Sequence, residues 1–277
     1  MPKEMSIIFA LSKDQFQCVK GLLPRNEGYV EPKAVLETNN PGWVFADSIC
    51  NPQAALIWSQ GNEGFYLAGR QIARYSGEIN ALIDTVIRPM LLSKGIDYFE
   101  VSSVPPVTDS ELQDAFPSRK LNSWQQSVYI YRKNQLVPDI VPREGCLCNM
   151  KDIWYKHSVQ NLEFVENKIL DYWDSINVFH AKANGFCLIM NDMVVSLSLT
   201  GWIFENTHEI SIETVKDYRR KGFAKIVSAA LVNAYLEQGC LPYWECEKSN
   251  TASAKLAVDL GFTKFHDYTC FGFPVSK

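Results

Sequence analysis

Three consecutive cations and a glycine occupy residues 219–222 and are well suited to binding phosphate. Residues 208–214, just before them, alternate between two sides, which is typical of a β-strand. Residues 226–234, after them, carry apolar side chains at helical spacing, and Gly239 is a suitable helix end. A loop that leads from a strand into a helix presents backbone N–H groups at the positive end of the helix dipole. The sequence therefore predicts a pyrophosphate cradle at this loop.

Other phosphate and metal motifs do not match. The chain contains no Gly-x-x-x-x-Gly-Lys-Ser/Thr run and no Gly-x-Gly-x-x-Gly after a strand. His208 and Glu209 begin like a zinc-protease helix, but Ile212 stands where the second histidine is needed. The alternative for residues 219–222 is a solvated basic turn, because cation clusters are common on protein surfaces.

Residues 219–224 resemble the Gln/Arg-x-x-Gly-x-Gly/Ala signature of the GNAT superfamily, the acyl-CoA-dependent N-acetyltransferases. Residues 239–247 resemble the next strand of that family, and residues 250–262 resemble the helix after it, which ends in Leu-Gly-Phe. Three matching segments in order are stronger evidence than one hexapeptide. The segments around Trp244 and at residues 209–220 are most similar to a bacterial subgroup that includes zwittermicin-A-resistance-type acetyltransferases.

The resemblance implies acetyl-CoA as the cosubstrate and no metal. The loop would hold the pyrophosphate, and the pantetheine arm would lie along the strand before it, where two strands of this fold splay apart. The residues expected to bind the coenzyme are Thr214, Val215, Arg219, Arg220, Lys221, Gly222, Phe223, Ala224, Asn250 and Ser253. Asn250 would also suit the N-cap of a helix without any ligand.

Glu209 and Glu213 are the expected catalytic residues, because the acceptor amine must lose a proton to a general base. Both share a strand face with Ser211, and Glu209 lies near the position where several members of the family carry a glutamate base. Two carboxylates on one face raise each other's proton affinity. The alternative is a solvated or salt-bridged strand face. His208 points to the other side and is expected to be structural.

One position departs from the family pattern. Many members place a tyrosine four residues before the glycine of Leu-Gly-Phe, where it protonates the leaving thiolate, and here Ala257 stands there. Tyr243 or Tyr268 could replace it, or water could supply the proton. Cys246 has no histidine nearby to activate it, so direct transfer is preferred to a covalent intermediate. Its neighbours on the same strand, Glu245 and Glu247, could line the amine pocket.

Composition limits the class of protein and of partner. The chain has 277 residues, of which 47% are apolar and 21% charged, with a net charge of −4. This balance argues against binding nucleic acids or anionic membranes. No stretch approaches the roughly 20 apolar residues of a membrane helix, and no signal peptide is evident, so a cytoplasmic location is expected. The expected partner is a small-molecule amine, and a homodimer is an option that the sequence leaves open.

Eight cysteines are scattered along the chain. Only Cys146 and Cys148 are close in sequence, and no second pair at zinc-binding spacing accompanies them. His157 and His180 could complete a metal site with them. Reduced, inert thiols are the preferred interpretation.

The predicted organisation is α/β, with mixed sheets and two domains. Residues 1–134 form an N-terminal α/β domain, residues 135–145 a linker rich in proline, and residues 146–277 the catalytic GNAT domain. The N-terminal elements are expected in the order of strands 42–47, 54–59 and 64–69, helix 79–92, strand 98–102, helix 108–116 and strand 127–131. This is the order of the family without its phosphate loop. We therefore expect either a degenerate copy of the same fold or an unrelated α/β domain.

The predicted catalytic domain begins with a mostly helical stretch, residues 149–180, with a break near Asn161. A β-hairpin follows, with strands 185–190 and 194–204 and Asn191 and Asp192 in the turn. The function expected for this domain is acetyl transfer from acetyl-CoA to a small amine. A non-catalytic acyl-CoA sensor and an O-acetyltransferase are the alternatives.

Overall fold

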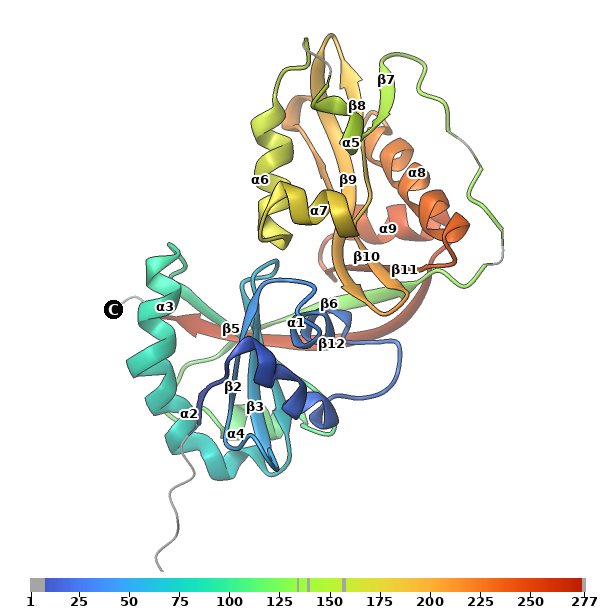
Figure 1. Ribbon diagram of the computed structural model, residues 1–277. Helices are drawn as coiled ribbons and strands as arrows, with labels where there is room; N and C mark the ends of the chain where they lie inside the picture. Colours follow the sequence, from blue (N-terminus) through green and yellow to red (C-terminus); the bar gives the residue numbers. More distant parts are fainter. Residues whose placement is uncertain (1–7, 134, 139, 156–157, 276–277) are drawn as a thin grey trace, which may run out of the picture. The chain divides into compact units, whose positions relative to one another are not determined.

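A computed structural model describes residues 8–133, 135–138, 140–155 and 158–275 of the chain (Figure 1). It divides into two compact units. The N-terminal unit comprises Met1–Gln126 and Asp267–Lys277, and the C-terminal unit comprises Ser127–His266. The sequence analysis predicted two domains, residues 1–134 and 146–277, joined by a linker at residues 135–145. These domain bounds stay a prediction, because compact units need not fold independently. Within the described residues, no helix has both the length and the apolar character needed to cross a membrane.

The sheet of the N-terminal unit is mixed. Its strands are β1 (Phe9–Ala10), β2 (Gly42–Ala46), β3 (Ala54–Ser59), β4 (Gly64–Gly69), β5 (Tyr98–Ser103) and the last residues of β12 (Thr263–Pro274). β1 to β4 pair antiparallel in sequence order, β4 pairs parallel with β5, and β5 pairs antiparallel with β12. The strands expected at β2 to β5 are thus present, whereas β12 is an addition that the sequence analysis did not include.

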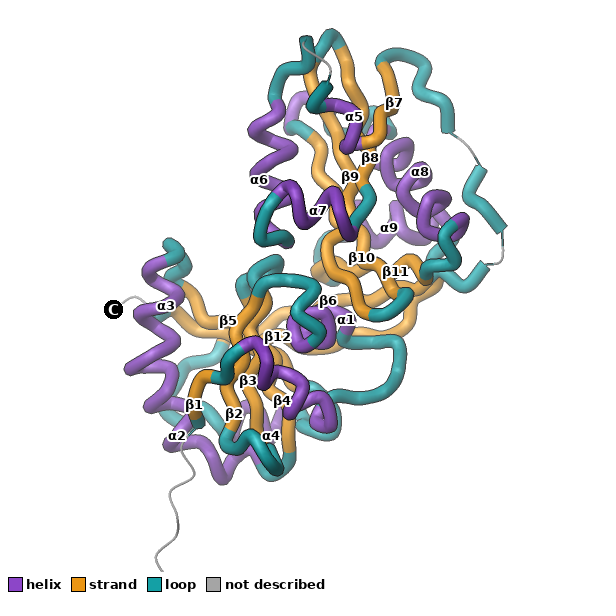
Figure 2. Tube along the Cα trace, viewed as in Figure 1, coloured by secondary structure: helices purple, strands orange, loops and turns teal. Residues whose placement is uncertain are grey.

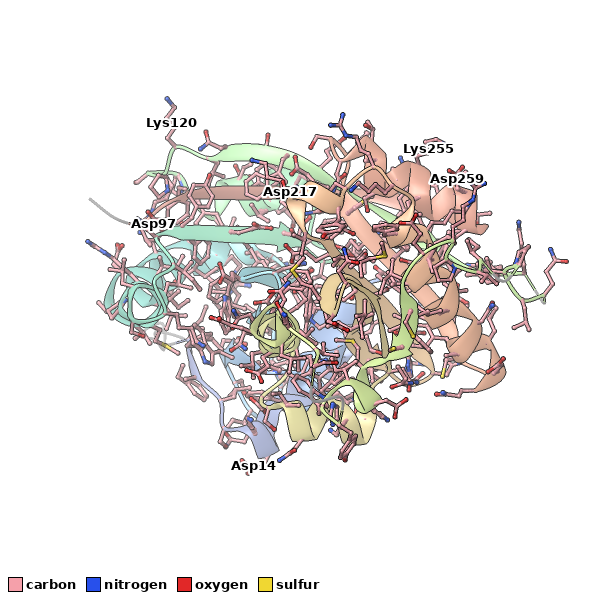
Figure 3. All side chains as sticks on the ribbon, turned by 90° about the horizontal axis from the view of Figure 1, so that it is seen from above. Asp14, Asp97, Lys120, Asp217, Lys255 and Asp259 are labelled. Atoms are coloured by element: carbon pink, nitrogen blue, oxygen red, sulfur yellow. The ribbon has the colours of Figure 1, made fainter. Side chains whose placement is uncertain are left out.

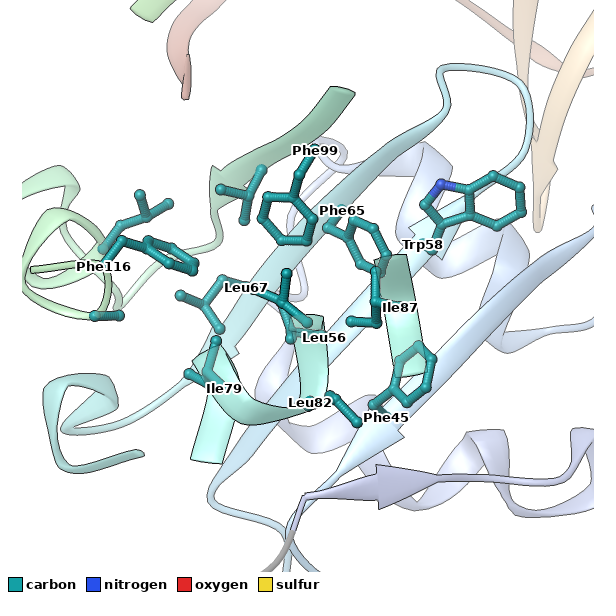
Figure 4. Packing of buried hydrophobic residues seen from close by; sticks show 14 of the residues in the cluster. Phe45, Leu56, Trp58, Phe65, Leu67, Ile79, Leu82, Ile87, Phe99 and Phe116 are labelled. Atoms are coloured by element: carbon teal, nitrogen blue, oxygen red, sulfur yellow. The ribbon is translucent and has the colours of Figure 1, made fainter. Parts of the chain in front are cut away.

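Helices cover both faces of this sheet. They are η1 (Lys13–Leu22), α1 (Val30–Leu36), η2 (Ile72–Tyr75), α2 (Ser76–Leu82), η3 (Ile83–Ile87), α3 (Arg88–Ser93) and α4 (Asp109–Asp114). Figure 4 shows Phe65 and Phe99 of the sheet in one apolar cluster with Ile79 and Ile87 of the helices. Side chains that point to the other face of the sheet, such as those of Val44 and Ile57, pack with η1 and α1 instead. The alternation of the strands therefore supplies two cores, one on each face.

The expected helix at residues 79–92 is present but irregular. Its middle turn, η3, is a π-helix, and Pro89 lies in the first turn of α3 directly after it. Proline lacks the N–H that would continue the α-helical ladder, so the irregularity falls where a donor is missing. Helix α4 begins with a side-chain cap: the Thr108 side chain accepts a hydrogen bond from the N–H of Glu111 at 3.2 Å.

The C-terminal unit also contains a mixed sheet, in the order β6-β11-β10-β9-β8-β7. Its strands are the last residues of β6 (Asn122–Ile130), β7 (Cys146–Asn149), β8 (Gly185–Met190), β9 (Met193–Phe204), β10 (Thr207–Thr214) and β11 (Leu241–Glu247). The predicted hairpin of β8 and β9 is confirmed. Asn191 and Asp192 form its turn with φ angles of 48° and 59°, the left-handed values that a two-residue turn of this kind requires.

Two groups of helices lie on opposite faces of this sheet (Figure 1). On one face are α5 (Met150–Ile153), α6 (Leu162–Tyr172) and α7 (Ile176–Lys182), and on the other are α8 (Phe223–Glu237) and α9 (Thr251–Leu260). The short η4 (Lys216–Tyr218) precedes α8. The break predicted near Asn161 is confirmed, because this residue has a left-handed φ of 64° just before α6.

The long loop between β6 and β7 (Figure 2) includes the expected linker, and part of it is anchored to α8. The N–H of Val137 donates to Oδ1 of Asn233 at 2.8 Å, and Nδ2 of Asn233 donates back to the carbonyl of Val137 at 2.9 Å. Val137 is buried. Sequence composition predicted the absence of a regular element here, but it contained no signal for this paired contact.

Candidate functional site

Strand β10 presents the expected catalytic residues on one face. Ser211 donates to the hydroxyl of Tyr172 in α6 at 3.1 Å, and Oε2 of Glu213 lies 3.8 Å from Nζ of Lys168 in the same helix. The side chain of Ile210 points to the opposite face of β10 and belongs to the apolar cluster that includes residues of α8. The predicted alternation is thus confirmed: the acidic face of β10 meets α6, and the apolar face meets α8.

The two candidate bases have different surroundings. Glu209 is only 3% exposed, whereas the side chain of Glu213 is 40% exposed and pairs with Lys168. Four residues along a strand separate their backbones by roughly 13 Å, so their mutual repulsion is weak. The expectation of a solvated face describes Glu213 but not Glu209, because burial depends on α6, which lies far away in sequence.

β10 pairs with β9 over a longer stretch than with β11. It pairs parallel with β11 over Thr207–Leu241, His208–Pro242 and Glu209–Tyr243, and antiparallel with β9 as far as Thr214. In the described part of the chain, the β10–β11 register does not continue beyond Glu209. The two strands therefore diverge beyond this residue, as the sequence resemblance led us to expect.

The direction of the backbone groups follows from this pairing. The N–H of Val215 donates to the carbonyl of Val195 beside β9, at 2.9 Å. Since successive residues of a strand direct their N–H and C=O to opposite sides, those of Thr214 and Ile212 point toward the diverging β11. Nε of Arg219 donates to the carbonyl of Thr214 at 2.9 Å. The amide of Val215 is thus committed to the sheet, whereas the N–H of Thr214 is directed into the opening.

The loop after β10 forms a concave backbone at the start of α8. Arg220 and Gly222 have φ angles of 61° and 83°, and Gly222 is the N-cap of the helix. The N–H groups of Gly222, Phe223 and Ala224 have no acceptor among the described residues. These are the first donors of a 15-residue helix, at the positive end of its dipole.

The cations of this loop are exposed. Arg220 and Lys221 both face solvent, and Nζ of Lys221 lies 4.8 Å from the ring centre of Tyr218. Asp217 is the acidic residue within the turn (Figure 3). With Arg219 and Lys216, the loop carries more positive than negative charge. A basic, amide-rich turn of this kind suits an anionic diphosphate.

Helix α9 begins on the far side of β11. Oδ1 of Asn250 accepts a hydrogen bond from the N–H of Ser253 at 3.1 Å, so Asn250 is the predicted N-cap. Oγ of Ser253 accepts a hydrogen bond from Nε1 of Trp244 at 3.0 Å. Further along this helix, Lys255 and Asp259 form an exposed ion pair of 2.8 Å (Figure 3). The hydrogen bond from Lys255 lowers the pKa of Asp259.

The side chains around Glu209 were only partly foreseen. Tyr172, from the predicted helical stretch of residues 149–180, packs edge-on against Trp202 with ring centres 5.1 Å apart. Tyr243, opposite Glu209 on β11, donates from its hydroxyl to Oε2 of Glu245 at 3.1 Å. Trp202 and the neighbouring Gly201 had no sequence signal, because their relation to Glu209 depends on how β9 pairs with β10.

His208 lies on the side of α8, as expected of a structural residue. Its ring packs edge-on against Tyr235 at 5.1 Å. Burial lowers the pKa of His208 to about 4, so the imidazole is neutral at physiological pH. Burial also raises the pKa of Tyr235 well above 10.

The position of the missing family tyrosine is in the core. Ala257 is fully buried in the apolar cluster with Leu231 and Trp244. Tyr268 belongs to the N-terminal unit, where its hydroxyl lies 3.4 Å from that of Tyr66. Burial raises the pKa of the Cys246 thiol, which argues against a cysteine nucleophile.

The cysteines are free thiols in this structure. Cys146 and Cys148 have Sγ atoms 3.4 Å apart on β7 and do not form a disulfide. His157 lies outside the described residues. Nε2 of His180 accepts a hydrogen bond from Nε1 of Trp154 at 2.9 Å, and burial together with Lys151 lowers its pKa. Among the residues that the structure describes, no group of three or more His, Cys, Asp and Glu side chains could hold a metal.

Comparison with known proteins gives consistent results over nearly the whole chain. A family model described as GNAT acetyltransferase matches residues 25–271. The chain is 24% identical over 269 residues to the uncharacterized N-acetyltransferase YdfB of Bacillus subtilis (strain 168), covering 96% of this chain and 99% of that protein.

Solved structures show the same fold. A GCN5-related N-acetyltransferase-like protein from Streptococcus suis matches with a TM-score of 0.65 and 18% identity, covering 93% of this chain and 98% of that one. A tandem GNAT protein from the clavulanic acid biosynthesis pathway matches with a TM-score of 0.58 and 11% identity, covering 98% of each chain.

Proposed function

The chain belongs to the GNAT acetyltransferase family, whose cosubstrate is an acyl-CoA, and from this premise we propose that it transfers the acetyl group of acetyl-CoA to a small-molecule amine. The observation that carries the proposal is the divergence of β10 from β11 beyond Glu209, next to the amide-rich start of α8. The opening exposes strand backbone, the helix start offers donors for phosphate, and a carboxylate lies where the two strands part.

The coenzyme would be held mainly by backbone. The N–H groups of Gly222, Phe223 and Ala224 would bind the pyrophosphate, with Arg219, Arg220 and Lys221 adding charge. The N–H of Thr214 would contact the pantetheine arm, and Val215 would contribute its side chain only. Asn250 and Ser253 would lie beside the coenzyme from α9. One strand N–H directed at the thioester oxygen would stabilise the oxyanion by about 3 kcal/mol.

The reaction would be a direct transfer. The amine nitrogen attacks the thioester carbonyl, a C–N bond forms, and the C–S bond breaks to release the coenzyme as thiolate. Glu209 would take the proton that the amine loses, directly or through water. Its burial favours it over Glu213, whose carboxylate is half exposed and paired with Lys168. Tyr243, opposite Glu209 on β11, would protonate the thiolate, with water as the alternative.

We assign the N-terminal unit as a degenerate copy of the same fold. Along the chain, the elements from β1 through α1, β2–β4, the helix of residues 76–93, β5 and α4 to β6 have the same order as the elements from β7 to β12. Where the C-terminal unit has its basic loop, the N-terminal unit has η2 with Ile72 fully buried. The residues around this turn lack the spacing of the family signature, so only the C-terminal unit would hold the coenzyme.

The residues around Trp244 and at 209–220 support the narrower assignment to the bacterial subgroup that includes zwittermicin-A-resistance-type acetyltransferases. An acceptor screen that includes zwittermicin A tests it. Acetylation of simpler amines only would contradict this narrower assignment and leave the family assignment unaffected.

A second candidate function follows from Ala257. Without the family tyrosine, the protein could bind acyl-CoA as a sensor and transfer nothing. To separate the two, the full chain is incubated with acetyl-CoA and a panel of amines and alcohols, and free thiol is measured over a range of pH. Thiol release with amines supports the proposed function, release with alcohols only indicates an O-acetyltransferase, and binding without release indicates the sensor.

A further inference from the structure

Strands β9 and β10 change register beside Glu209. His208 is opposite Ile203, but Ile210 is opposite Thr200. One residue of β10, Glu209, therefore faces two residues of β9, which is the arrangement of a β-bulge. Bulges change the direction of side chains in a sheet, and this one brings Gly201 of β9 against the side chain of Glu209.

Gly201 leaves room that the Glu209 carboxylate fills. A Cβ atom added at Gly201 would overlap Oε2 of Glu209 and lie 3.1 Å from Cε1 of Tyr172. Gly201 does not have a positive φ, so any residue could adopt its backbone conformation. The site needs glycine here for space and not for backbone freedom.

The backbone around Gly201 is held on both sides. The preceding residue, Thr200, accepts a hydrogen bond from the hydroxyl of Tyr235 at 2.7 Å through Oγ1. The same hydroxyl lies 3.3 Å from the carbonyl oxygen of Glu209, so it ties β9 to β10. The following residue, Trp202, packs against the ring of Tyr172. Because β9 has little freedom to retreat, a methyl group at position 201 must displace the carboxylate.

We propose that Gly201 is a positioning residue that determines where the Glu209 carboxylate lies when it accepts the proton of the amine. This inference rests on the proposed function and assigns a role to a residue that contacts neither substrate. The overlap corresponds to a displacement of roughly 1 Å, and a misplacement of that size can reduce a rate by about 100-fold.

The test is a cycle of four proteins: wild type, Gly201→Ala, Glu209→Gln and the double variant, assayed with acetyl-CoA and an amine found active in the screen. We expect Gly201→Ala to lower kcat by about 10- to 100-fold. The KM for acetyl-CoA should change by less than about twofold, because the coenzyme loop is untouched. In the Glu209→Gln background the same alanine should cost less than about twofold, since no base is left to misplace.

A shorter acid provides the second arm. Glu209→Asp withdraws the carboxylate by one methylene, so adding Gly201→Ala to it should lower kcat by less than about threefold. It should also restore thermal stability that Gly201→Ala alone loses. Gly185→Ala is the matched control, because a Cβ at this residue of β8 would overlap the side chain of Met150. We expect it to lower the melting temperature with kcat unchanged.

The outcomes separate the two claims. Equal losses of kcat from Gly201→Ala in the wild-type and Glu209→Gln backgrounds, or no loss in either, would overturn the positioning role. If Gly201→Ala does not fold and Glu209→Asp does not rescue it, the strain lies with Tyr172, and the role is also overturned. If Glu209→Gln is as active as wild type, the assignment of the base itself fails.

One readout requires no turnover. In protein labelled with ¹³C at glutamate carboxyls, the resonance that Glu209→Gln removes identifies Glu209. We expect Gly201→Ala to shift this resonance and its titration midpoint, whereas Gly185→Ala leaves both in place. An unmoved resonance in Gly201→Ala contradicts the displacement even if no acceptor has been found.

Discussion

The hydroxyl of Ser211 on β10 donates a hydrogen bond of 3.1 Å to the hydroxyl of Tyr172 at the end of α6, in a buried setting. This bond links the acidic face of the central strand to the helix that covers it. It also holds the Tyr172 ring beside Gly201 and Trp202. The surroundings of Glu209 therefore include a contact between residues 39 positions apart.

The energy of this contact can be measured with a double-mutant cycle. Ser211→Ala and Tyr172→Phe should each lower the free energy of unfolding by about 1–2 kcal/mol, with a coupling of about 1 kcal/mol between them. Ser198→Ala is the matched control, because this serine is equally buried and its Oγ has no partner in the described part of the chain. Combined with Tyr172→Phe it should show a coupling near zero. Urea unfolding of the six proteins decides this.

The two carboxylates of β10 should differ in function. Glu209→Gln should lower kcat by about 100-fold or more, because it removes the proposed base. Glu213→Gln should change kcat by less than about threefold, since it removes only a half-exposed ion pair with Lys168. Steady-state rates across pH 6–9 measure both. The reverse ranking would assign the base to Glu213.

Gly222→Asp should abolish coenzyme binding. The substitution places negative charge and bulk where the phosphates would approach the backbone, and it forces a non-glycine residue to adopt a φ of 83°. Calorimetric titration with coenzyme A measures the affinity. Gly77→Asp is the control, because Gly77 also lies in the first turn of a helix with open space around it, but in the N-terminal unit. Unchanged affinity in Gly222→Asp would count against the cradle.

Stability should depend on pH through His208. Its folded-state pKa of about 4 lies below its ordinary value of 6.5, so the unfolded chain binds more protons between these values. The stabilisation from the neutral imidazole is complete above pH 6.5 and is lost as the pH falls toward 4, up to about 3 kcal/mol. Urea unfolding between pH 4.5 and 7 measures this slope. His208→Asn should flatten it, and an unchanged slope would show that another group is responsible.

Restoring the family tyrosine should not restore a general acid. Ala257 is fully buried, so Ala257→Tyr overpacks the cluster around α9 and should destabilise the protein by about 1–3 kcal/mol or more without raising kcat. Val258→Tyr, at the next residue, is 57% exposed and should change stability by less than about 0.5 kcal/mol. Thermal unfolding and kcat measure both variants. A faster Ala257→Tyr enzyme would show that the ring reaches the leaving thiolate.

Local patterns were enough to place the main elements of the site. The alternation of residues 208–214 predicted β10 and its two faces, and the spacing of residues 226–234 predicted α8, since side-chain direction in a strand or helix follows from sequence period. Asn191 and Asp192 predicted their turn because these residues tolerate positive φ. The break at Asn161 and the cap at Asn250 follow from similar local preferences.

Other parts of the chain show where such patterns are insufficient. Helix α1 and the edge strand β7 were missed, and β6 begins at Asn122, earlier than expected. Short edge strands have little period to detect, and β6 extends because it finds a partner strand. Helix α1 begins after Tyr29, which adopts a left-handed φ of 56° that nothing in its sequence neighbourhood predicts.

The sequence by itself determined which residues alternate, which turn carries cations at a helix start, and which family the chain resembles, because each of these depends on neighbours along the chain. Tertiary structure alone decided that Glu209 is buried while Glu213 is exposed, that β11 parts from β10 beyond Glu209, and that Gly201 provides room for the carboxylate. These relations depend on strand register and on α6, which join residues far apart in sequence, and no local period encodes them.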